Sequence, residues 1–124
     1  MSSKKGAILS HSGTTEKWNR KIRADIRRLA NQIVERFSPA GVILFGSHAQ
    51  GQADPDSDVD LLVILPDDAK LVTSLDIRRA VSCDIPLDIL VYSRQALEQR
   101  VSAGDFFLRD ALDTGVVLYE KPGE

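Results

Sequence analysis

The chain has 124 residues, of which 43% are hydrophobic and 27% charged, and its formal net charge at pH 7 is −2. These values are ordinary for a soluble globular protein, and the length predicts one domain with a single modest core. They exclude a membrane-spanning protein, because the longest apolar run, Leu61 to Leu65, ends at Pro66 and a membrane helix needs about eighteen or more apolar residues.

The N-terminus and the cysteine content point to the cytoplasm. Lys4 and Lys5 are not followed by an apolar segment, so we do not expect a secretory signal. Cys83 is the only cysteine, so no internal disulfide can form. A buried thiol in a reducing cytoplasm is the simplest interpretation.

Basic and acidic residues are unevenly distributed. Residues 1–36 contain nine Lys or Arg and three Asp or Glu, whereas residues 37–124 contain seven and fifteen. We favour a basic, solvated helix face packed on an acidic domain over a basic surface for phosphates or an acidic partner. Nucleic-acid binding is disfavoured, because the chain as a whole is acidic.

The chain is predicted to begin with a disordered tail, residues 1–13, followed by one domain, residues 14–124. Thr14 or Thr15 can cap a helix that runs to about Phe37. Steps of three and four residues place its apolar side chains on one stripe: Trp18, Ile22, Ile26, Leu29, Ile33 and Phe37.

Two strands and a polar loop follow the first helix. Val42 to Phe45 is rich in β-branched and aromatic residues, which favours a strand. Gly46 to Ser57 is polar and predicts a loop. Val59 to Leu65 is almost continuously apolar after Asp60, which indicates a central strand covered on both faces.

The remaining chain predicts alternating helices and strands. In order, these are a helix over 68–82, a strand over 87–92, a helix from the Ser93 cap to about Val101, a helix over about 105–114 with Gly115 in the C′ position, and a short strand over 116–119.

Three aspartates carry most of the functional information. Asp58 and Asp60 flank Val59, and Asp88 lies in the later apolar run. Because side chains alternate along a strand, Asp58 and Asp60 project the same way about 6.6 Å apart. Asp88 can join them if the two strands pair. Burying unpaired carboxylates is costly, so a cation should hold them. Mg²⁺ suits such an oxygen cage, and two ions would clamp an in-line displacement at phosphorus.

Gly46 and Ser47 come where the first strand gives way to the loop. Glycine lets the backbone approach a triphosphate closely, and exposed N–H groups together with the Ser47 hydroxyl can bind its oxygens. Asp88 could also help to deprotonate an acceptor hydroxyl. The combined pattern predicts divalent-metal and phosphate chemistry without a catalytic His or Cys.

Together these motifs resemble the minimal nucleotidyltransferase family of the DNA polymerase β-like nucleotidyltransferase superfamily. The resemblance covers about residues 20–120. It depends on Leu44-Phe45-Gly46-Ser47, Gly51, the segment from Ser57 to Val63 that contains Asp58-Val59-Asp60, the segment from Leu87 to Val91, and the closing segment from Gly115 to Tyr119. The implied fold class is α/β (α+β), a small mixed β-sheet with helices packed on it.

The resemblance implies a function as well. Asp58, Asp60 and Asp88 would bind two Mg²⁺ ions, and Gly46 and Ser47 would hold the nucleoside triphosphate. The reaction would transfer AMP from ATP to an acceptor hydroxyl. Proteins of this kind are typically paired, as antitoxins, with a helical HEPN-domain toxin, so a toxin tyrosine is the expected acceptor.

One position departs from the family pattern. Relatives commonly carry Arg in the loop where this chain has Gln50, which puts the rate and the choice of nucleotide in question. His48 could compensate in part, although we favour a solvated loop histidine there.

Two alternatives remain open. The protein could be a non-catalytic antitoxin that masks a toxin stoichiometrically through Phe106, Phe107 and Leu108, since three consecutive apolar residues on a helix cannot all face one core. Burial of that helix from two sides would also explain them. Alternatively, it could modify an antibiotic or another small molecule, with a homodimer supplying the second wall of the pocket.

Overall fold

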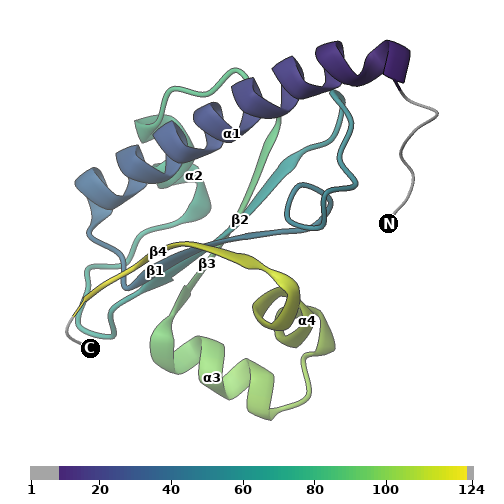
Figure 1. The fold of residues 1–124 in the computed structure, drawn as a ribbon. Helices are drawn as coiled ribbons and strands as arrows, with labels where there is room; N and C mark the ends of the chain where they lie inside the picture. The colour runs from purple at the N-terminus through teal and green to yellow at the C-terminus, as the bar shows by residue number, and fades with distance from the viewer. Residues whose placement is uncertain (1–8, 123–124) are drawn as a thin grey trace.

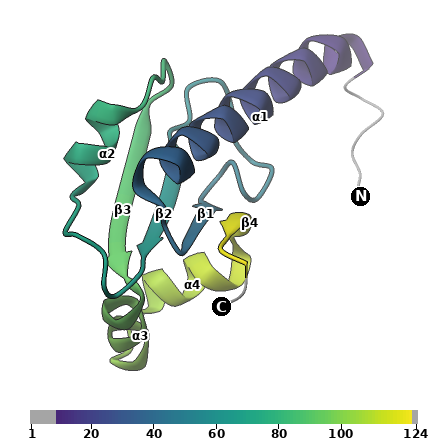
Figure 2. The same ribbon diagram turned by 90° about the vertical axis from the view of Figure 1, so that its left-hand side faces the viewer.

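The structure, a computed structural model, describes the backbone of residues 9–122 and the side chains of residues 20–122. The elements are α1 (Leu9–Phe37), β1 (Gly41–Phe45), β2 (Val59–Leu65), α2 (Ser74–Ala80), β3 (Leu87–Ser93), α3 (Arg94–Ser102), α4 (Phe106–Thr114) and β4 (Val116–Glu120). The α+β class is confirmed, with helices on both faces of one mixed sheet (Figures 1 and 2).

The strand order in the sheet is β3-β2-β1-β4. β2 pairs parallel with β3 and antiparallel with β1, and β1 pairs antiparallel with β4. The prediction that Val59–Leu65 forms a central strand is therefore confirmed. α1 and α2 lie on one face of the sheet and α3 and α4 on the other (Figure 1).

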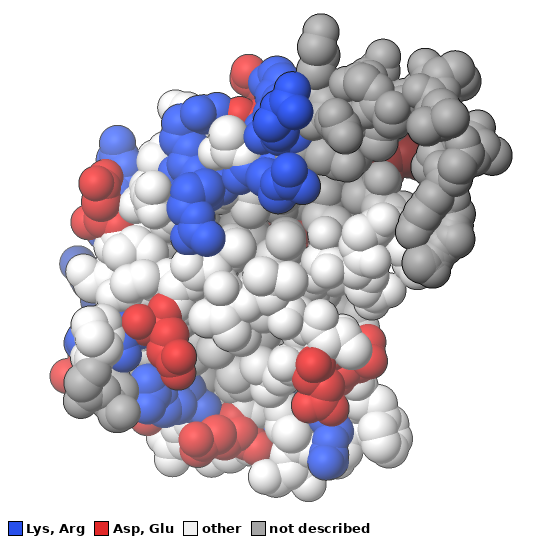
Figure 3. Space-filling model, viewed as in Figure 1, with Lys and Arg blue, Asp and Glu red and all other residues white. Residues whose placement is uncertain are grey.

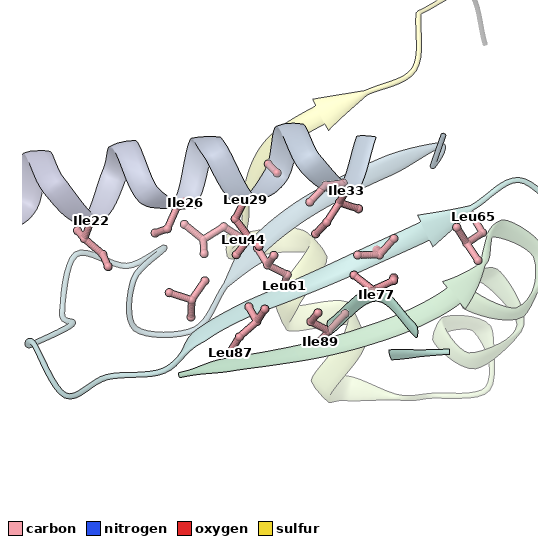
Figure 4. Packing of buried hydrophobic residues seen from close by; sticks show 14 residues of the cluster. Ile22, Ile26, Leu29, Ile33, Leu44, Leu61, Leu65, Ile77, Leu87 and Ile89 are labelled. Atoms are coloured by element: carbon pink, nitrogen blue, oxygen red, sulfur yellow. The ribbon is translucent and has the colours of Figure 1, made fainter. Parts of the chain in front are cut away.

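The apolar stripe of α1 packs into the larger core cluster. Ile22, Ile26, Leu29 and Ile33 are buried, as their spacing predicts, and Phe37 is half-buried. They pack against alternate residues of the strands, among them Leu44, Leu61 and Ile89 (Figure 4). The Trp18 side chain lies outside the described residues.

A smaller core cluster occupies the opposite face of the sheet. Its buried members come from β1, β2, α3 and α4: Ile43, Phe45, Leu62, Leu97, Leu108 and Ala111. Because β2 alternates, Leu61 faces α1 while Leu62 faces α3 and α4. This second face also carries Asp60, two residues before Leu62.

Three local predictions about the helices need correction. α1 begins at Leu9, earlier than Thr14 or Thr15, so residues 9–13 are helical; the rest of the predicted tail, residues 1–8, lies outside the described residues. Once a helix is nucleated, each further residue adds a hydrogen bond at little cost.

α2 is shorter than the predicted 68–82. Thr73 forms a capping box with Asp76 that defines its start: the Thr73 hydroxyl accepts from the Asp76 N–H, and the Asp76 carboxylate accepts from the Thr73 N–H. The third correction concerns Gly115, which ends α4 in an extended conformation with φ −74° rather than left-handed. A Cβ there would lie 2.4 Å from the Ala111 carbonyl oxygen and 2.7 Å from Ile43 Cγ2, so close packing requires this glycine.

Basic side chains gather over α1 on the face seen in Figure 3. Lys21 and Arg28 both pair with Asp25, and Arg27 donates to the Leu118 carbonyl at 2.8 Å. The basic stretch is thus an exposed helix face, which both interpretations of the charge distribution require. None of the described helices is long and apolar enough to cross a membrane. Cys83 is half-buried, and its thiol donates to the Ile85 carbonyl at 3.3 Å.

Candidate active site

The site begins at Gly46, the residue that follows β1. Gly46 has φ +78°, and a Cβ at this position would lie 2.3 Å from Asp60 Oδ2. Only glycine therefore lets the backbone turn here while the Asp60 carboxylate lies directly against it. The sequence predicts a close approach of the Gly46 backbone to a triphosphate, and that stays a prediction; the group that lies against Gly46 in the structure is the Asp60 carboxylate.

Asp60 and Asp88 are neighbours on parallel strands. β2 and β3 pair in a register that places Asp60 opposite Asp88, and Asp60 is also opposite Phe45 of β1. Both carboxylates line one cavity of about 270 Å³. Its lining residues are Phe45, Gly46, Gln50, Asp60, Asp88, Phe107, Asp110, Ala111 and Thr114. The pairing of β2 with β3 therefore brings Asp60 and Asp88 together, as the sequence predicts.

Asp58 lies just ahead of β2 and is exposed. The loop before it is ordered by Asp54, whose Oδ1 accepts from the Asp56 N–H at 2.9 Å and from the Ser57 hydroxyl at 3.2 Å. The Val59 N–H donates to the Pro86 carbonyl at 2.8 Å and ties this end of β2 to β3. Asp58 is close enough to act on Asp60 electrostatically but does not line the cavity.

The carboxylates repel one another. Burial raises the pKa of Asp60 above its usual value of 3.8, and the negative charges of Asp88 and then Asp58 raise it further, while His48 opposes the effect. A carboxylate placed among others in this way is stabilised by any cation that arrives beside it.

The donor set suits a divalent cation that shares its ligands with a substrate. Among residues 20–122, no three His, Cys, Asp or Glu side chains are close enough to hold a metal by themselves. Mg²⁺, however, is usually held by one or two carboxylates, water and substrate phosphates. Asp60 and Asp88 provide that pair, with Asp58 beside them, so the residues fit the ion.

The loop after Gly46 forms a tight turn. The Gly46 carbonyl accepts from the N–H groups of Ala49 at 3.1 Å and Gln50 at 3.2 Å. Ser47 is half-buried in this turn but does not line the cavity. The preference for a solvated His48 is wrong, because the ring is half-buried and its Nε2 lies 3.3 Å from the Ser57 carbonyl, to which it donates. His48 thus links the turn to the segment that carries Asp58.

Sequence reasoning missed the wall that α4 contributes. Phe107, Asp110, Ala111 and Thr114 line the cavity opposite Gly46. Their spacing of three, four and seven residues is a helical-face signal that could have identified them as a group. It could not have shown that this face meets Asp60 and Asp88, because the contact depends on how α4 packs on the sheet.

Comparisons with known proteins identify the family of the chain. The family model described as "Nucleotidyltransferase domain" matches residues 26–116. A protein from Methanocaldococcus jannaschii, provisionally named a protein adenylyltransferase, is 30% identical over 78 residues, which are 63% of this chain and 76% of the relative.

Two solved structures share the fold. A provisionally assigned nucleotidyltransferase from Sulfolobus solfataricus superposes with a TM-score of 0.60 at 16% identity, over 99% of this chain and 95% of that one. A structure described as a toxin-antitoxin with AMP-PNP gives a TM-score of 0.55 at 20% identity, over 77% of this chain and 74% of that one. With the matched segment running from α1 to the start of β4 and containing Gly46, Asp58, Asp60 and Asp88, the chain belongs to the nucleotidyltransferase domain family.

Proposed function

We propose that this nucleotidyltransferase uses Mg²⁺ and ATP to transfer AMP to a hydroxyl group of a protein, a tyrosine of a cognate HEPN-domain toxin, and so acts as its antitoxin. Two comparisons support the finer parts of the proposal. The relative from Methanocaldococcus jannaschii is provisionally named a protein adenylyltransferase. One structural neighbour is a toxin-antitoxin with AMP-PNP, a non-hydrolysable analogue of ATP.

The observation that carries the proposal is the contact between Gly46 and Asp60. It places the backbone turn at the end of β1 against a carboxylate that is itself paired with Asp88. A phosphate bound at the Ser47 hydroxyl, at the start of that turn, would lie beside the carboxylates that would hold the metal. This is the arrangement that phosphoryl chemistry needs, since positioning and charge stabilisation do most of the work.

The residues divide the work as follows. Asp58, Asp60 and Asp88 would hold Mg²⁺, which when bound neutralises charge on the triphosphate. The Ser47 hydroxyl and the backbone at the start of the turn would bind phosphate oxygens. The Ala49 and Gln50 N–H groups donate to the Gly46 carbonyl and keep the turn closed.

The reaction is a displacement at the α-phosphorus of ATP. The acceptor oxygen forms a bond to that phosphorus, the bond from the phosphorus to the β-phosphate oxygen breaks, and pyrophosphate leaves. The acceptor proton passes to Asp88, which is exposed at the mouth of the cavity and can release it to solvent.

The test is transfer of label from ATP labelled in its α-phosphate to the purified product of the neighbouring gene, in the presence of Mg²⁺. The wild type is compared with Asp58→Asn/Asp60→Asn. Asp56→Asn is the matched control, because it makes the same chemical change in the same loop at an exposed residue outside the site.

We expect label on the partner with the wild type and with Asp56→Asn, and at least about a hundredfold less with the double variant. Label that persists in the double variant would remove the carboxylates from the mechanism. If the wild type transfers no label, AMP transfer to this partner is wrong.

A second candidate function is stoichiometric masking of a toxin. It is favoured by Phe106 and Phe107, which are 81% and 60% exposed although Leu108 beside them is only 1% exposed. Masking predicts that Asp58→Asn/Asp60→Asn still neutralises the toxin, while Phe106→Ser/Phe107→Ser does not. The catalytic proposal predicts that the carboxylate variant fails to neutralise it.

A further inference from the structure

α4 presents one face to the candidate active site. Phe107, Asp110, Ala111 and Thr114 line the cavity that contains Asp60. Ala111 is buried in the core cluster on this side of the sheet, and its small side chain lets the helix pack closely there. The Thr114 hydroxyl donates to the Asp110 carbonyl at 2.8 Å, within the helix. Phe107 and Asp110 are the two members of this face whose side chains remain available to a ligand.

The Phe107 ring is exposed but held in place. It meets Phe45 edge to face, with ring centroids 5.7 Å apart and planes at 88°. Phe45 is itself buried and precedes Gly46 in the chain. Contact with a buried ring limits the motion of Phe107, so its free surface is a preformed apolar wall at the cavity mouth.

The two walls of the cavity have different chemistry. The wall formed by Gly46 is backbone without a side chain, which a polyanion can approach closely. The wall formed by α4 offers an aromatic ring and the exposed carboxylate of Asp110, which would repel a triphosphate. At about 270 Å³ the cavity is also smaller than the roughly 300–1,000 Å³ of sites that enclose a drug-sized ligand. It accommodates the reacting ends of two ligands rather than one whole nucleotide.

We propose that Phe107 and Asp110 form the acceptor-binding wall of the active site. The Phe107 ring packs against the aromatic ring of a phenolic acceptor. The Asp110 carboxylate accepts a hydrogen bond from the acceptor hydroxyl as it arrives, and that hydrogen bond shifts to Asp88 before the proton is transferred. That contact directs the acceptor oxygen toward the α-phosphorus held on the Gly46 side. The inference deepens the proposed function and rests on it.

The same helix supplies matched controls. Phe106 and Asp113 are exposed, as Phe107 and Asp110 are, and have the same side chains, but they do not line the cavity. Asp110→Asn is therefore compared with Asp113→Asn, and Phe107→Leu with Phe106→Leu. Thermal unfolding of all four variants shows whether each one folds as the wild type does.

The experiment measures initial rates of AMP transfer to the purified partner protein, varying the partner at saturating ATP and then ATP at saturating partner. Affinity for a fluorescent ATP analogue gives an independent measure of nucleotide binding. We expect Phe107→Leu to raise KM for the partner about 3- to 10-fold and Asp110→Asn to lower kcat/KM for the partner about tenfold or more. Both should leave KM for ATP and the analogue affinity within about twofold.

The outcomes separate the two proposals. If the wild type transfers label but Phe107→Leu or Asp110→Asn instead weakens ATP binding, the wall belongs to the nucleotide and the inference is overturned. If Phe106→Leu and Asp113→Asn change the kinetic constants as much as Phe107→Leu and Asp110→Asn do, the effect does not depend on the cavity. That result would also overturn the inference. If the wild type transfers no label, both the proposed function and the acceptor wall are wrong.

Discussion

Asp60 is held where a charge is unfavourable unless a cation joins it. Burial and the neighbouring charges of Asp88 and Asp58 raise its pKa. The raised pKa makes Asp60 a weaker acid, and the same surroundings would favour a bound cation. The consequences can be measured on the free protein as well as through catalysis.

The first prediction concerns stability against pH. Because the folded-state pKa of Asp60 is raised, the folded protein binds this proton more tightly than the unfolded chain does. The stabilisation is present below the unfolded value near 4 and is lost as the pH rises through the raised pKa. Asp60→Asn should lose less stability than the wild type over that interval, measured by urea unfolding from pH 3 to 8. Asp113→Asn should follow the wild-type profile; identical profiles for all three proteins would contradict the repulsion.

The second prediction concerns Gly46. Gly46→Ala forces a side chain into the left-handed region and puts its Cβ 2.3 Å from Asp60 Oδ2, whereas Gly51→Ala has φ +73° with no atom within 4 Å. Both variants should lose about 1–2 kcal/mol through backbone strain. Only Gly46→Ala should also displace the carboxylate and lower AMP transfer about a hundredfold. Label transfer and thermal unfolding check this, and equal activity losses in the two variants would leave backbone strain as the whole cause.

At the scale of elements, the closing segment of the chain depends on one tight contact. α4 must stop and β4 must begin within a single residue, Gly115, so that β4 can pair with β1. The glycine is needed for space rather than for its φ, because the backbone of Leu44 and Ala111 surrounds it.

Gly115→Ala should destabilise the protein by about 1–3 kcal/mol, because its Cβ would meet the Ala111 carbonyl at 2.4 Å and the Leu44 carbonyl at 2.9 Å, and backbone atoms cannot move aside cheaply. Gly41→Ala is the control, since its Cβ would make ordinary contacts of 3.5 Å and 3.7 Å. It should be close to neutral. Thermal unfolding measures both, and a neutral Gly115→Ala would mean that α4 can shift away from β1.

The whole molecule is a sheet with a separate core cluster on each face. Ile33 belongs to the cluster under α1, and Leu108 to the cluster under α3 and α4. Neither residue packs in the other's cluster, yet both clusters share β1 and β2. This arrangement makes the central strands the common support of the basic helix on one side and the acceptor wall on the other.

Ile33→Ala and Leu108→Ala should each lower the free energy of unfolding by about 2–5 kcal/mol, since both side chains are almost fully buried. Because they have no shared partners, the double variant should lose the sum of the two within about 0.5 kcal/mol. Urea unfolding of the two single variants and the double variant tests this. A double loss well outside the sum would show that the two clusters are coupled through the sheet.

Much of the fold could be predicted from the spacing of apolar residues along the chain. The stripe from Ile22 to Ile33 predicted the buried face of α1, and the continuous apolar run of Val59–Leu65 predicted a central strand. Local hydrogen-bonding capacity predicted the Ser93 cap, whose hydroxyl accepts from the Ala96 N–H at 3.1 Å. The start of α1 and both ends of α2 were mispredicted, whereas the end of α1 at Phe37 was predicted correctly. Helix propagation and a single capping box outweigh average propensity over a short window.

The sequence by itself determined the chemistry of this protein: a glycine and a serine after a strand, followed by three aspartates at strand starts, indicated phosphate and metal chemistry because few other needs place carboxylates there. Only the tertiary structure decided which atoms meet. The parallel register of β2 and β3 sets Asp60 beside Asp88, and packing sets Gly46 against Asp60. The position of α4 decided that Phe107 and Asp110 close the cavity. These contacts join residues far apart in the chain, and their geometry depends on how whole elements pack rather than on any local pattern.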